Sequence, residues 1–332
     1  MSQRVVMVDK AVPFEGKHWD RLVDAIGADQ LLAVDLKDKT AVEQALETAE
    51  IAILAGDLDS RFINAPRLRW IHCDHAGLTK SAKPEVFERG LIVTGSAGRS
   101  GPALAEHVLM FALMLCSRYP DLYEAQKRQE WFRTPSMFDL RALYGRTIGI
   151  LGMGHTGVEL AKRAKAFNMT VLGYRRRDLP RPEGVDEMFS ADKGDSINPM
   201  LERADVLALV LNLSDATHHL IDAAAIARMK PGSVIVNLAR GGVIDQDALI
   251  AALQSGQLAG AGLDVTDPEP LPKGHPLWTA PNVLITPHFT AAVPDKVDRS
   301  LDVITDNFRR YRAGEPMLNR MTAEDLWTRE AR

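Results

Sequence analysis

Residues 147–167, TIGILGMGHTGVELAKRAKAF, decide how this sequence of 332 residues is interpreted. The stretch begins with a short apolar run typical of a buried strand and ends with an amphipathic run typical of a helix. Between the two runs, Gly152, Gly154 and Gly157 have the spacing G-x-G-x-x-G. The first glycine permits a tight turn, the second lets a pyrophosphate approach the backbone, and the third allows helix and strand to pack closely. The stretch therefore predicts a dinucleotide-binding loop.

The helix expected after this loop contributes to the same site. Its N-terminus supplies backbone N–H groups and the positive end of the helix dipole, both of which favour a phosphate. We therefore expect the whole loop to contact the cofactor, that is, Gly152, Met153, Gly154, His155, Thr156 and Gly157.

A basic run, VLGYRRRDL (171–179), follows about twenty residues after the glycine loop. At the end of this second strand the motif expects an acidic residue that binds the ribose 2′-OH, and here Arg175 stands instead, followed by Arg176. A guanidinium pairs with a 2′-phosphate through charge-assisted hydrogen bonds, so the run favours NADP over NAD. The alternatives are a solvated basic turn and a nucleic-acid patch.

The composition is that of a globular protein without a general affinity for polyanions. A net charge of -4 and a pI near 6.2 argue against a nucleic-acid or anionic-membrane binder. Cys73 and Cys116 are the only cysteines, so no disulfide framework is expected and a reducing compartment fits. Asp9 and Lys10 interrupt the first apolar run, which is therefore too short for the apolar region of a signal peptide. No run approaches the roughly 20 apolar residues of a membrane span. We expect a cytoplasmic protein.

Short apolar runs alternate with amphipathic stretches along the chain, which predicts parallel sheets with helices on both faces. The runs form two series, and the length of the chain also favours two domains. The first series comprises residues 4–8, 31–35, 51–55, 68–73 and 91–95, and the second comprises 147–152, 170–174, 205–211, 233–239, 260–265 and 282–287.

Two long helical patterns connect and follow these series. Residues 102–129 predict one long helix, with Pro102 in the first turn and an apolar face broad enough to be buried. Residues 291–314 predict a helix that ends at Gly314 as its C-cap. Because this last helix follows the second sheet, we expect it to return to the first domain and to make that domain discontinuous.

Three residues that could take part in the same reaction lie just past strands of the second series. Arg240 follows residues 233–239, Glu269 lies in the Pro-rich loop after 260–265, and His288 follows the strand near 282–287. In open α/β sheets, ligands bind at these carboxyl ends of the strands. Hydride transfer involving a 2-hydroxy acid needs a cation for the carboxylate and carbonyl, a base for the hydroxyl proton and a carboxylate that holds the base. Arg240, His288 and Glu269 fit these roles.

The motifs around these residues resemble the D-isomer-specific 2-hydroxyacid dehydrogenase family. The similar stretches are LGMGHTG (151–157), MKPGSVIVNLARGGVIDQDALIAALQSGQLAGAGLDVTDPEPLP (229–272) and HPLWTAPNVLITPH (275–288), within a resemblance that covers about residues 90–316. The resemblance implies two Rossmann-like doubly wound parallel-sheet α/β domains. A discontinuous, flavodoxin-like substrate domain takes residues 1–101 and 291–332, and the dinucleotide-binding domain with the interdomain helix takes residues 102–290.

The resemblance also implies roles for single residues. Arg240 binds the substrate carboxylate and carbonyl, while His288 is the acid/base and Glu269 its partner. Asp264 matches the residue that contacts the nicotinamide carboxamide, and Ala239 is a further cofactor contact.

Substrate binding extends to the first half of the chain in this family. The resemblance implies that backbone N–H groups of Ala76 and Gly77, in the segment HAGL, bind the substrate carboxylate, and that Arg99 and Ser100 face the cleft. NAD-using members usually carry Asp where this chain has Arg175, so NADP is the preferred cofactor here and NAD remains possible.

The predicted function is NAD(P)-dependent transfer of hydride between nicotinamide and C2 of a D-2-hydroxy acid, in the direction of 2-keto acid reduction of the glyoxylate or hydroxypyruvate type. A phosphoglycerate-type dehydrogenase and phosphite oxidation remain open. Formate oxidation is disfavoured because the formate enzymes of this family pair the histidine with Gln instead of Glu269. The alternative from another class is a non-enzymatic, dinucleotide-sensing interaction protein. Apart from the small acid, the expected partner is a second copy in a homodimer.

The segment HCDH (72–75) brings together two histidines, a cysteine and an aspartate, which raises the possibility of a metal site. Alternate residues of such a strand-like segment face opposite sides, and no second ligand cluster with zinc-like spacing occurs. We therefore expect no metal.

Overall fold

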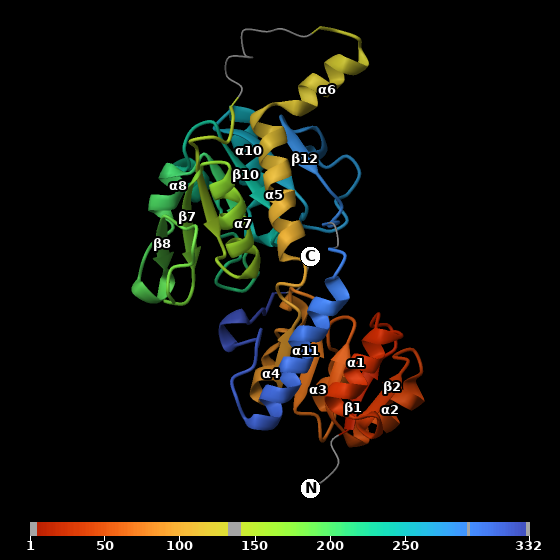
Figure 1. Cartoon of the computed structure of the whole chain (residues 1–332). Helices are drawn as coiled ribbons and strands as arrows, with labels where there is room; N and C mark the ends of the chain where they lie inside the picture. The colour runs from red at the N-terminus through yellow and green to blue at the C-terminus, as the bar shows by residue number, and fades with distance from the viewer. Residues whose placement is uncertain (1–4, 132–140, 291–292, 330–332) are drawn as a thin grey trace. The chain divides into compact units, whose positions relative to one another are not determined.

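The computed structural model describes residues 5–131, 141–290 and 293–329 (Figure 1). Among these, residues 5–99 with 293–329 form one compact unit, and residues 100–290 form a second. The chain thus leaves the first unit after Arg99 and returns to it at Val293. The predicted domain boundary lies slightly later, after residue 101, and the predicted limits at residues 1, 291 and 332 lie outside the described residues.

The first unit contains a five-stranded sheet in the order β2-β1-β3-β4-β5, and every pairing between its strands is parallel. This order is that of flavodoxin-like doubly wound sheets, which confirms the fold predicted for this unit. The strands are β1 (Val5–Asp9), β2 (Leu31–Val34), β3 (Ala49–Leu54), β4 (Trp70–Cys73) and β5 (Ile92–Gly95). The helices between them are α1 (Lys17–Ile26), α2 (Lys39–Thr48), α3 (Ser60–Asn64) and α4 (Pro84–Glu88).

Both faces of this sheet are buried, which explains why its strands are apolar throughout. One face, which carries Val6 and Ile51, packs against α1 and against α11 (Lys296–Ala313) through Leu301 and Phe308. The opposite face, which carries Met7, packs against the other helices. α11 ends at Gly314, whose φ of 69° is the left-handed C-cap that the sequence predicts.

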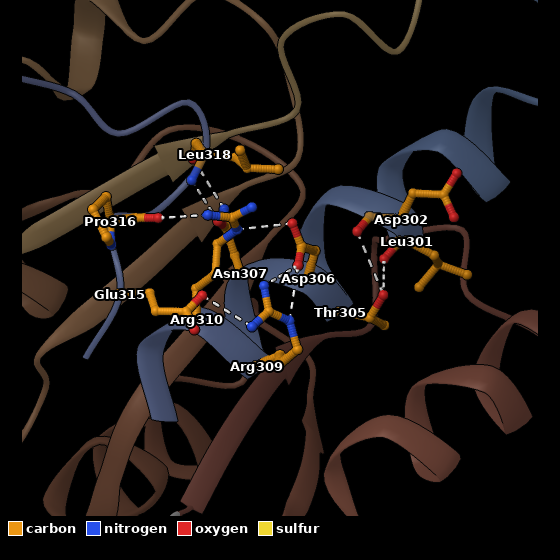
Figure 2. Close-up of polar contacts among 10 residues, drawn as sticks. All are labelled: Leu301, Asp302, Thr305, Asp306, Asn307, Arg309, Arg310, Glu315, Pro316 and Leu318. Atoms are coloured by element: carbon orange, nitrogen blue, oxygen red, sulfur yellow. Dashed lines mark hydrogen bonds and ion pairs between the residues drawn. The ribbon is translucent and has the colours of Figure 1, made fainter. Parts of the chain in front are cut away.

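The chain after α11 is held by side chains of the helix (Figure 2). Asn307 is fully buried, and its amide donates to the carbonyl of Leu318 at 3.0 Å while its oxygen accepts the Leu318 N–H at 2.7 Å. Arg310 donates to the carbonyl of Pro316 at 3.1 Å, and Arg309 forms an ion pair with Glu315 at 2.9 Å. These contacts direct the following residues along β5.

Asn319 and Met321 form hydrogen bonds along the outer edge of β5. Met321 N–H donates to the carbonyl of Val93 at 2.8 Å, and the amide of Asn319 donates to the carbonyls of Gly95 and Ala97 at 3.1 and 3.0 Å. The C-terminal segment therefore fixes the end of β5 and the residues that lead toward the second unit.

The second unit contains a seven-stranded parallel sheet in the order β12-β11-β10-β9-β6-β7-β8. Counted from β6, this is the order 3-2-1-4-5-6 of the Rossmann fold with one strand added, so the fold prediction is confirmed. The strands are β6 (Thr147–Leu151), β7 (Thr170–Arg175), β8 (Glu187–Ser190), β9 (Val206–Leu209), β10 (Ser233–Asn237), β11 (Leu258–Leu263) and β12 (Val283–Ile285). The helices are α5 (Gly101–Cys116), α6 (Tyr119–Lys127), α7 (His155–Ala166), α8 (Asn198–Arg203), α9 (Ala223–Arg228) and α10 (Gln246–Ser255).

Short 3-10 helices lie between these elements and after α11. They are η1 (Ala28–Gln30), η2 (Thr79–Ser81), η4 (Ala191–Lys193), η5 (Gly241–Val243), η6 (Pro276–Thr279) and η7 (Ala323–Asp325).

The prediction of one long helix over residues 102–129 is wrong. The structure has α5 with Pro102 in its first turn and, after a break, the separate helix α6 (Figure 1). The break occurs at Arg118, whose φ of 50° cannot continue a right-handed helix, and Pro120 begins the next helix. α5 packs on the sheet because β11 offers glycine there: a Cβ on Gly262 would lie 2.7 Å from the ring of Phe111.

Candidate active site

The glycine loop lies between the ends of β6 and β9, where the strand order of the sheet reverses. Gly152 has a φ of 109°, and a Cβ there would lie 2.6 Å from the carbonyl oxygen of Val210, just beyond β9. A Cβ on Gly157 would lie within 3.0 Å of the carbonyl oxygen of Gly152. Around Gly154, by contrast, a Cβ would have no atom within 4 Å. The outer two glycines thus permit close packing, and the middle one faces open space.

This open space is adjacent to the N-terminus of α7. Gly154 is the N-cap of the helix, and His155 and Thr156 form its first turn. Met153 is buried beneath the loop, where its side chain approaches the position of a Cβ on Gly173. A pyrophosphate placed over Gly154 would meet the backbone N–H groups and the positive end of the helix dipole. The loop therefore fits the phosphates of a dinucleotide.

Arg175 is the last residue of β7, and its side chain folds over the loop that follows. Its Nε donates to the carbonyl of Arg177 at 3.0 Å, and a terminal nitrogen donates to the carbonyls of Leu179 and Pro180, the latter at 3.0 Å. Arg176 is exposed, and its carbonyl accepts the Ser190 hydroxyl at 3.1 Å. The guanidinium of Arg175 thus lies at the predicted ribose end of the site, bonded to its own turn.

Glu269 and His288 are hydrogen-bonded to each other. The distance from Nδ1 of His288 to Oε2 of Glu269 is 2.9 Å, and the side chains are 47% and 38% exposed. Oε1 of Glu269 accepts the backbone N–H of Thr266 at 3.1 Å. Burial raises the pKa of Glu269, but the hydrogen bond and charge of His288, the Thr266 N–H and the charge of Arg240 outweigh this effect and hold the pKa below its ordinary value. Glu269 is therefore a carboxylate at neutral pH.

Arg240 directly follows the turn after β10. Its Nη1 donates to the carbonyl of Ala239 at 2.7 Å, and its own carbonyl accepts from the side-chain amide of Asn237 at 3.0 Å. The Asn237 oxygen accepts the N–H of Ala239 at 2.9 Å. Asn237 is buried and holds both backbone groups, so it fixes the segment that carries Arg240.

Asp264 connects the end of β11 to the segment around His288. The residue is buried, and one carboxylate oxygen accepts the hydroxyl of Thr286 at 2.5 Å and the N–H of Phe289 at 2.9 Å. The other oxygen accepts the hydroxyl of Thr290 at 2.9 Å. Since a carboxylate has about four lone-pair sites, one further donor can bind there. The family resemblance implies that Asp264 contacts the nicotinamide carboxamide, and nothing in the sequence indicates these protein contacts.

Gln246 also holds this site together, although its sequence position alone does not predict that role. It is the first residue of α10, and its amide oxygen accepts the N–H of Asp267 at 3.0 Å while its nitrogen donates to the Asp267 carbonyl. Gly241 packs on the same backbone, because a Cβ on it would lie 2.5 Å from the Asp267 nitrogen. These contacts hold the loop of Glu269 against the segment of Arg240. The only signal in the sequence was the pair of glycines after Arg240.

Ala76 and Gly77 belong to the first unit, on the loop after β4. The loop is fixed at its start, since the carbonyl of His75 accepts the N–H of Ser96 at 3.0 Å. Nearby, Arg99 forms an ion pair with the buried Asp74 at 2.8 Å. The structure thus places the predicted substrate loop at the carboxyl end of its own sheet.

The HCDH segment separates into two networks, as alternation along a strand predicts. The ring of the buried His72 bonds to the hydroxyls of Thr94 at 2.9 Å and Ser96 at 3.0 Å, and burial lowers its pKa to about 4. Cys73 instead lies 3.8 Å from the hydroxyl of Ser81, and burial raises the pKa of its thiol to about 12. Within residues 5–131, 141–290 and 293–329, no group of three His, Cys, Asp or Glu side chains is arranged to hold a metal ion. None of the helices in this part of the chain is long and apolar enough to cross a membrane.

A Rossmann-ordered sheet that presents an open glycine loop and a hydrogen-bonded acid–base pair at strand ends defines a nicotinamide-dependent oxidoreductase. The family model of the D-isomer specific 2-hydroxyacid dehydrogenase NAD binding domain matches residues 109–290. The chain belongs to the D-isomer specific 2-hydroxyacid dehydrogenase family. Membership confirms the predicted enzyme class, which transfers hydride between a nicotinamide cofactor and C2 of a 2-hydroxy or 2-keto acid.

Relatives of known name and a solved structure support membership of this family. The chain is 32% identical to D-3-phosphoglycerate dehydrogenase of Methanocaldococcus jannaschii over 89% of this chain, but it spans only 55% of that protein. It is 32% identical to glyoxylate reductase of Korarchaeum cryptofilum over 80% of each chain. The structure of a D-isomer specific 2-hydroxyacid dehydrogenase from Xanthobacter autotrophicus Py2, in complex with NADPH and MES, is similar with a TM-score of 0.80 and 27% identity, covering 97% of this chain and 99% of that chain.

Proposed function

We propose that this enzyme reduces a small 2-keto acid of the glyoxylate or hydroxypyruvate type, with Arg240, Glu269 and His288 as its catalytic residues. The observation that carries the proposal is the bond of 2.9 Å between Nδ1 of His288 and Oε2 of Glu269, in the unit that also contains the glycine loop. The relative named glyoxylate reductase, matched over 80% of this chain, supports the substrate class.

The hydrogen bond to Glu269 determines which nitrogen of His288 does chemistry. Nδ1 is occupied by Oε2, so Nε2 is the nitrogen that exchanges a proton with the oxygen on C2 of the substrate. The carboxylate of Glu269 stabilises the imidazolium that gives the proton in the direction of reduction. Arg240 supplies a permanent positive charge for the substrate carboxylate and for the polarised carbonyl. When bound, the nicotinamide supplies the hydride.

The cofactor contacts that we propose follow from the geometry of the loop. The residues at the phosphates are Gly152, Met153, Gly154, His155, Thr156 and Gly157, and Ala239 and Asp264 contact the nicotinamide end. Arg175 and Arg176 make NADP the preferred cofactor, with NAD as an alternative. This preference requires the Arg175 guanidinium to exchange the carbonyls of its own turn for a 2′-phosphate, which offers the stronger, charge-assisted bonds.

The first unit is proposed to bind the substrate. Its loop after β4 offers the backbone N–H groups of Ala76 and Gly77 to the carboxylate. We propose residues 1–101 and 291–332 as the substrate domain and residues 102–290 as the cofactor domain, bounds that lie within about two residues of the observed division after Arg99 and before Val293.

We also propose that the enzyme is a homodimer and that it is cytoplasmic. A homodimer is supported by large apolar side chains that remain exposed on α5 and α6, namely Met110, Leu113, Tyr119 and Tyr123. A cytoplasmic location is supported by Cys73 and Cys116, which are both free thiols. Light scattering of the purified chain tests the dimer directly, and a monomer at micromolar concentration would contradict it.

Steady-state kinetics with NADH and NADPH side by side test the activity. The substrate panel is glyoxylate, hydroxypyruvate, pyruvate, 3-phosphohydroxypyruvate and a bulkier 2-keto acid. The proposal expects the highest kcat/KM for glyoxylate or hydroxypyruvate and a better KM for NADPH. Preference for the phosphorylated acid indicates a phosphoglycerate-type enzyme instead, and a chain that binds cofactor but turns over no substrate indicates a dinucleotide sensor.

A further inference from the structure

The backbone at His288 adopts a conformation that its surroundings have to impose. Its φ is 51°, in the left-handed region that non-glycine residues seldom occupy. Such a conformation persists only where the neighbouring contacts over-determine it. The backbone N–H of His288 donates to the carbonyls of Asp264 at 2.8 Å and of Thr286 at 3.0 Å. The contacts of Asp264 and Thr286 therefore decide where the imidazole of His288 points.

The hydroxyl of Thr286 makes two hydrogen bonds with a defined direction. It has one hydrogen, and it gives this hydrogen to Asp264 at 2.5 Å because a carboxylate only accepts. Nε2 of His107 lies 3.2 Å from the same hydroxyl oxygen. Since the hydrogen of Thr286 is committed, His107 is the donor and carries its proton on Nε2. The bonds thus run from His107 to Thr286 and from Thr286 to Asp264.

His107 lies on α5 and is itself well placed to hold this direction. Its ring packs edge-on against Phe111, with the ring centroids 4.6 Å apart. Burial lowers the pKa of His107, with the charge of Asp264 opposing, so the ring is neutral at neutral pH and has a single N–H to give. No motif in the sequence indicates a role for His107.

We propose that His107 is a positioning residue for His288. Its N–H orients the Thr286 hydroxyl toward Asp264, and the Asp264 carboxylate then holds Phe289 and Thr290, the two residues after His288. This inference rests on the proposed acid–base role of His288. It adds a residue on a helix distant in sequence, which acts through the backbone of the catalytic segment.

Four variants separate the hydrogen bond from packing. His107→Phe keeps an aromatic ring against Phe111 but removes the donor, and His107→Gln restores an N–H near the position of Nε2. Thr286→Val removes the hydroxyl at nearly constant shape. The matched control is Thr305→Val on α11, where the hydroxyl donates to the carbonyl of Leu301 at 2.8 Å in the other unit (Figure 2).

Hydrogen–deuterium exchange of residues 284–290 measures the positioning without requiring turnover. We expect the amides of this segment to exchange at least roughly tenfold faster in His107→Phe and Thr286→Val than in the parent. The His107→Gln and Thr305→Val proteins should exchange as the parent does. Equal exchange in His107→Phe and the parent, or equal losses in His107→Phe and His107→Gln, would overturn the proposal.

Kinetics provide the second readout. A misplaced imidazole lowers kcat by about 10- to 100-fold, while the KM of the keto acid, which Arg240 binds, changes by less than about threefold. The double variant His107→Phe/Thr286→Val should be no slower than the slower single variant, because both changes break the same chain of bonds. Fully additive losses contradict this chain. If the parent reduces no keto acid, the proposed function fails, and the exchange experiment still decides the role of His107.

Discussion

Two alanine substitutions in the glycine loop should have different effects: Gly157→Ala should lower stability, and Gly154→Ala should weaken cofactor binding. Both add one methyl group, and the two positions are three residues apart. A Cβ on Gly157 would lie within 3.0 Å of the Gly152 carbonyl oxygen and 3.1 Å from the carbonyl carbon. A Cβ on Gly154 would meet no atom within 4 Å, and its φ of -88° suits alanine.

The magnitudes follow from this geometry. Ordinary contacts of a Cβ begin near 3.4 Å, so Gly157→Ala forces α7 away from the loop by several tenths of an ångström or more. Overpacking of this kind costs about 1–3 kcal/mol. In a domain of this size each kcal/mol lowers the Tm by about 2–4 °C, which predicts a fall of about 2–12 °C. Gly154→Ala should leave the Tm within about 1 °C of the parent, because nothing has to move.

Cofactor affinity should respond most directly to the change at Gly154. The methyl of Gly154→Ala occupies the space in which a pyrophosphate approaches the backbone, so the Kd for NADPH should rise by at least about tenfold, equivalent to about 1.4 kcal/mol. Thermal unfolding without cofactor and a fluorescence titration with NADPH measure the two effects separately. The reasoning is refuted if Gly154→Ala binds NADPH as tightly as the parent, or if Gly157→Ala melts at the temperature of the parent.

Three further changes test the cofactor end, the catalytic pair and the sheet. Replacing Arg175 and Arg176 with serine should raise the KM for NADPH at least about tenfold more than that for NADH; an equal response of both cofactors would show a solvated turn. His288→Gln should lower kcat at least about 100-fold with little change in the Kd for NADPH, and unchanged turnover would disprove the mechanism. Burial raises the pKa of Asp205, but Lys230 at 2.7 Å and the other partners of the carboxylate outweigh this and lower the pKa. The resulting stability is present above the unfolded pKa of about 3.9 and is lost as the pH falls through the lower folded value. In chemical denaturation Asp205→Asn should therefore cost about 1–3 kcal/mol at pH 7, and the difference from the parent should shrink below about pH 4; a constant difference would exclude linkage to this carboxylate.

Much of the fold was predictable because its signals are local. Buried parallel strands are continuous apolar runs, so the predicted strands recur in the structure with shifted ends. β8 was missed because Glu187–Ser190 is only half-buried and lacks such a run. The break between α5 and α6 escaped because Arg118 has no intrinsic preference for a positive φ, although Pro120 was a sign of a new helix start.

The sequence predicts those residues of the site that lie at the ends of predicted strands. The chemistry of their residue types and the family resemblance predict that Glu269 and His288 act as a pair, and in the structure the two side chains are hydrogen-bonded. The contacts of Asp264 and Gln246 were not foreseen. They join residues about 20 positions apart through side-chain and backbone groups, and no periodicity in the sequence records such contacts.

The division of the first unit between the two ends of the chain has a consequence for synthesis on the ribosome. Residues 5–99 emerge first, but the face of their sheet that carries Val6 and Ile51 waits for α11, which is made only after the entire second unit. At about 5–20 residues per second, that delay lasts on the order of 10–40 s. The Rossmann unit, which is continuous in sequence, can complete its folding in this interval. The nascent first sheet meanwhile exposes the apolar face that α11 later covers. We therefore expect a chaperone to bind this early part of the chain and to prevent its aggregation.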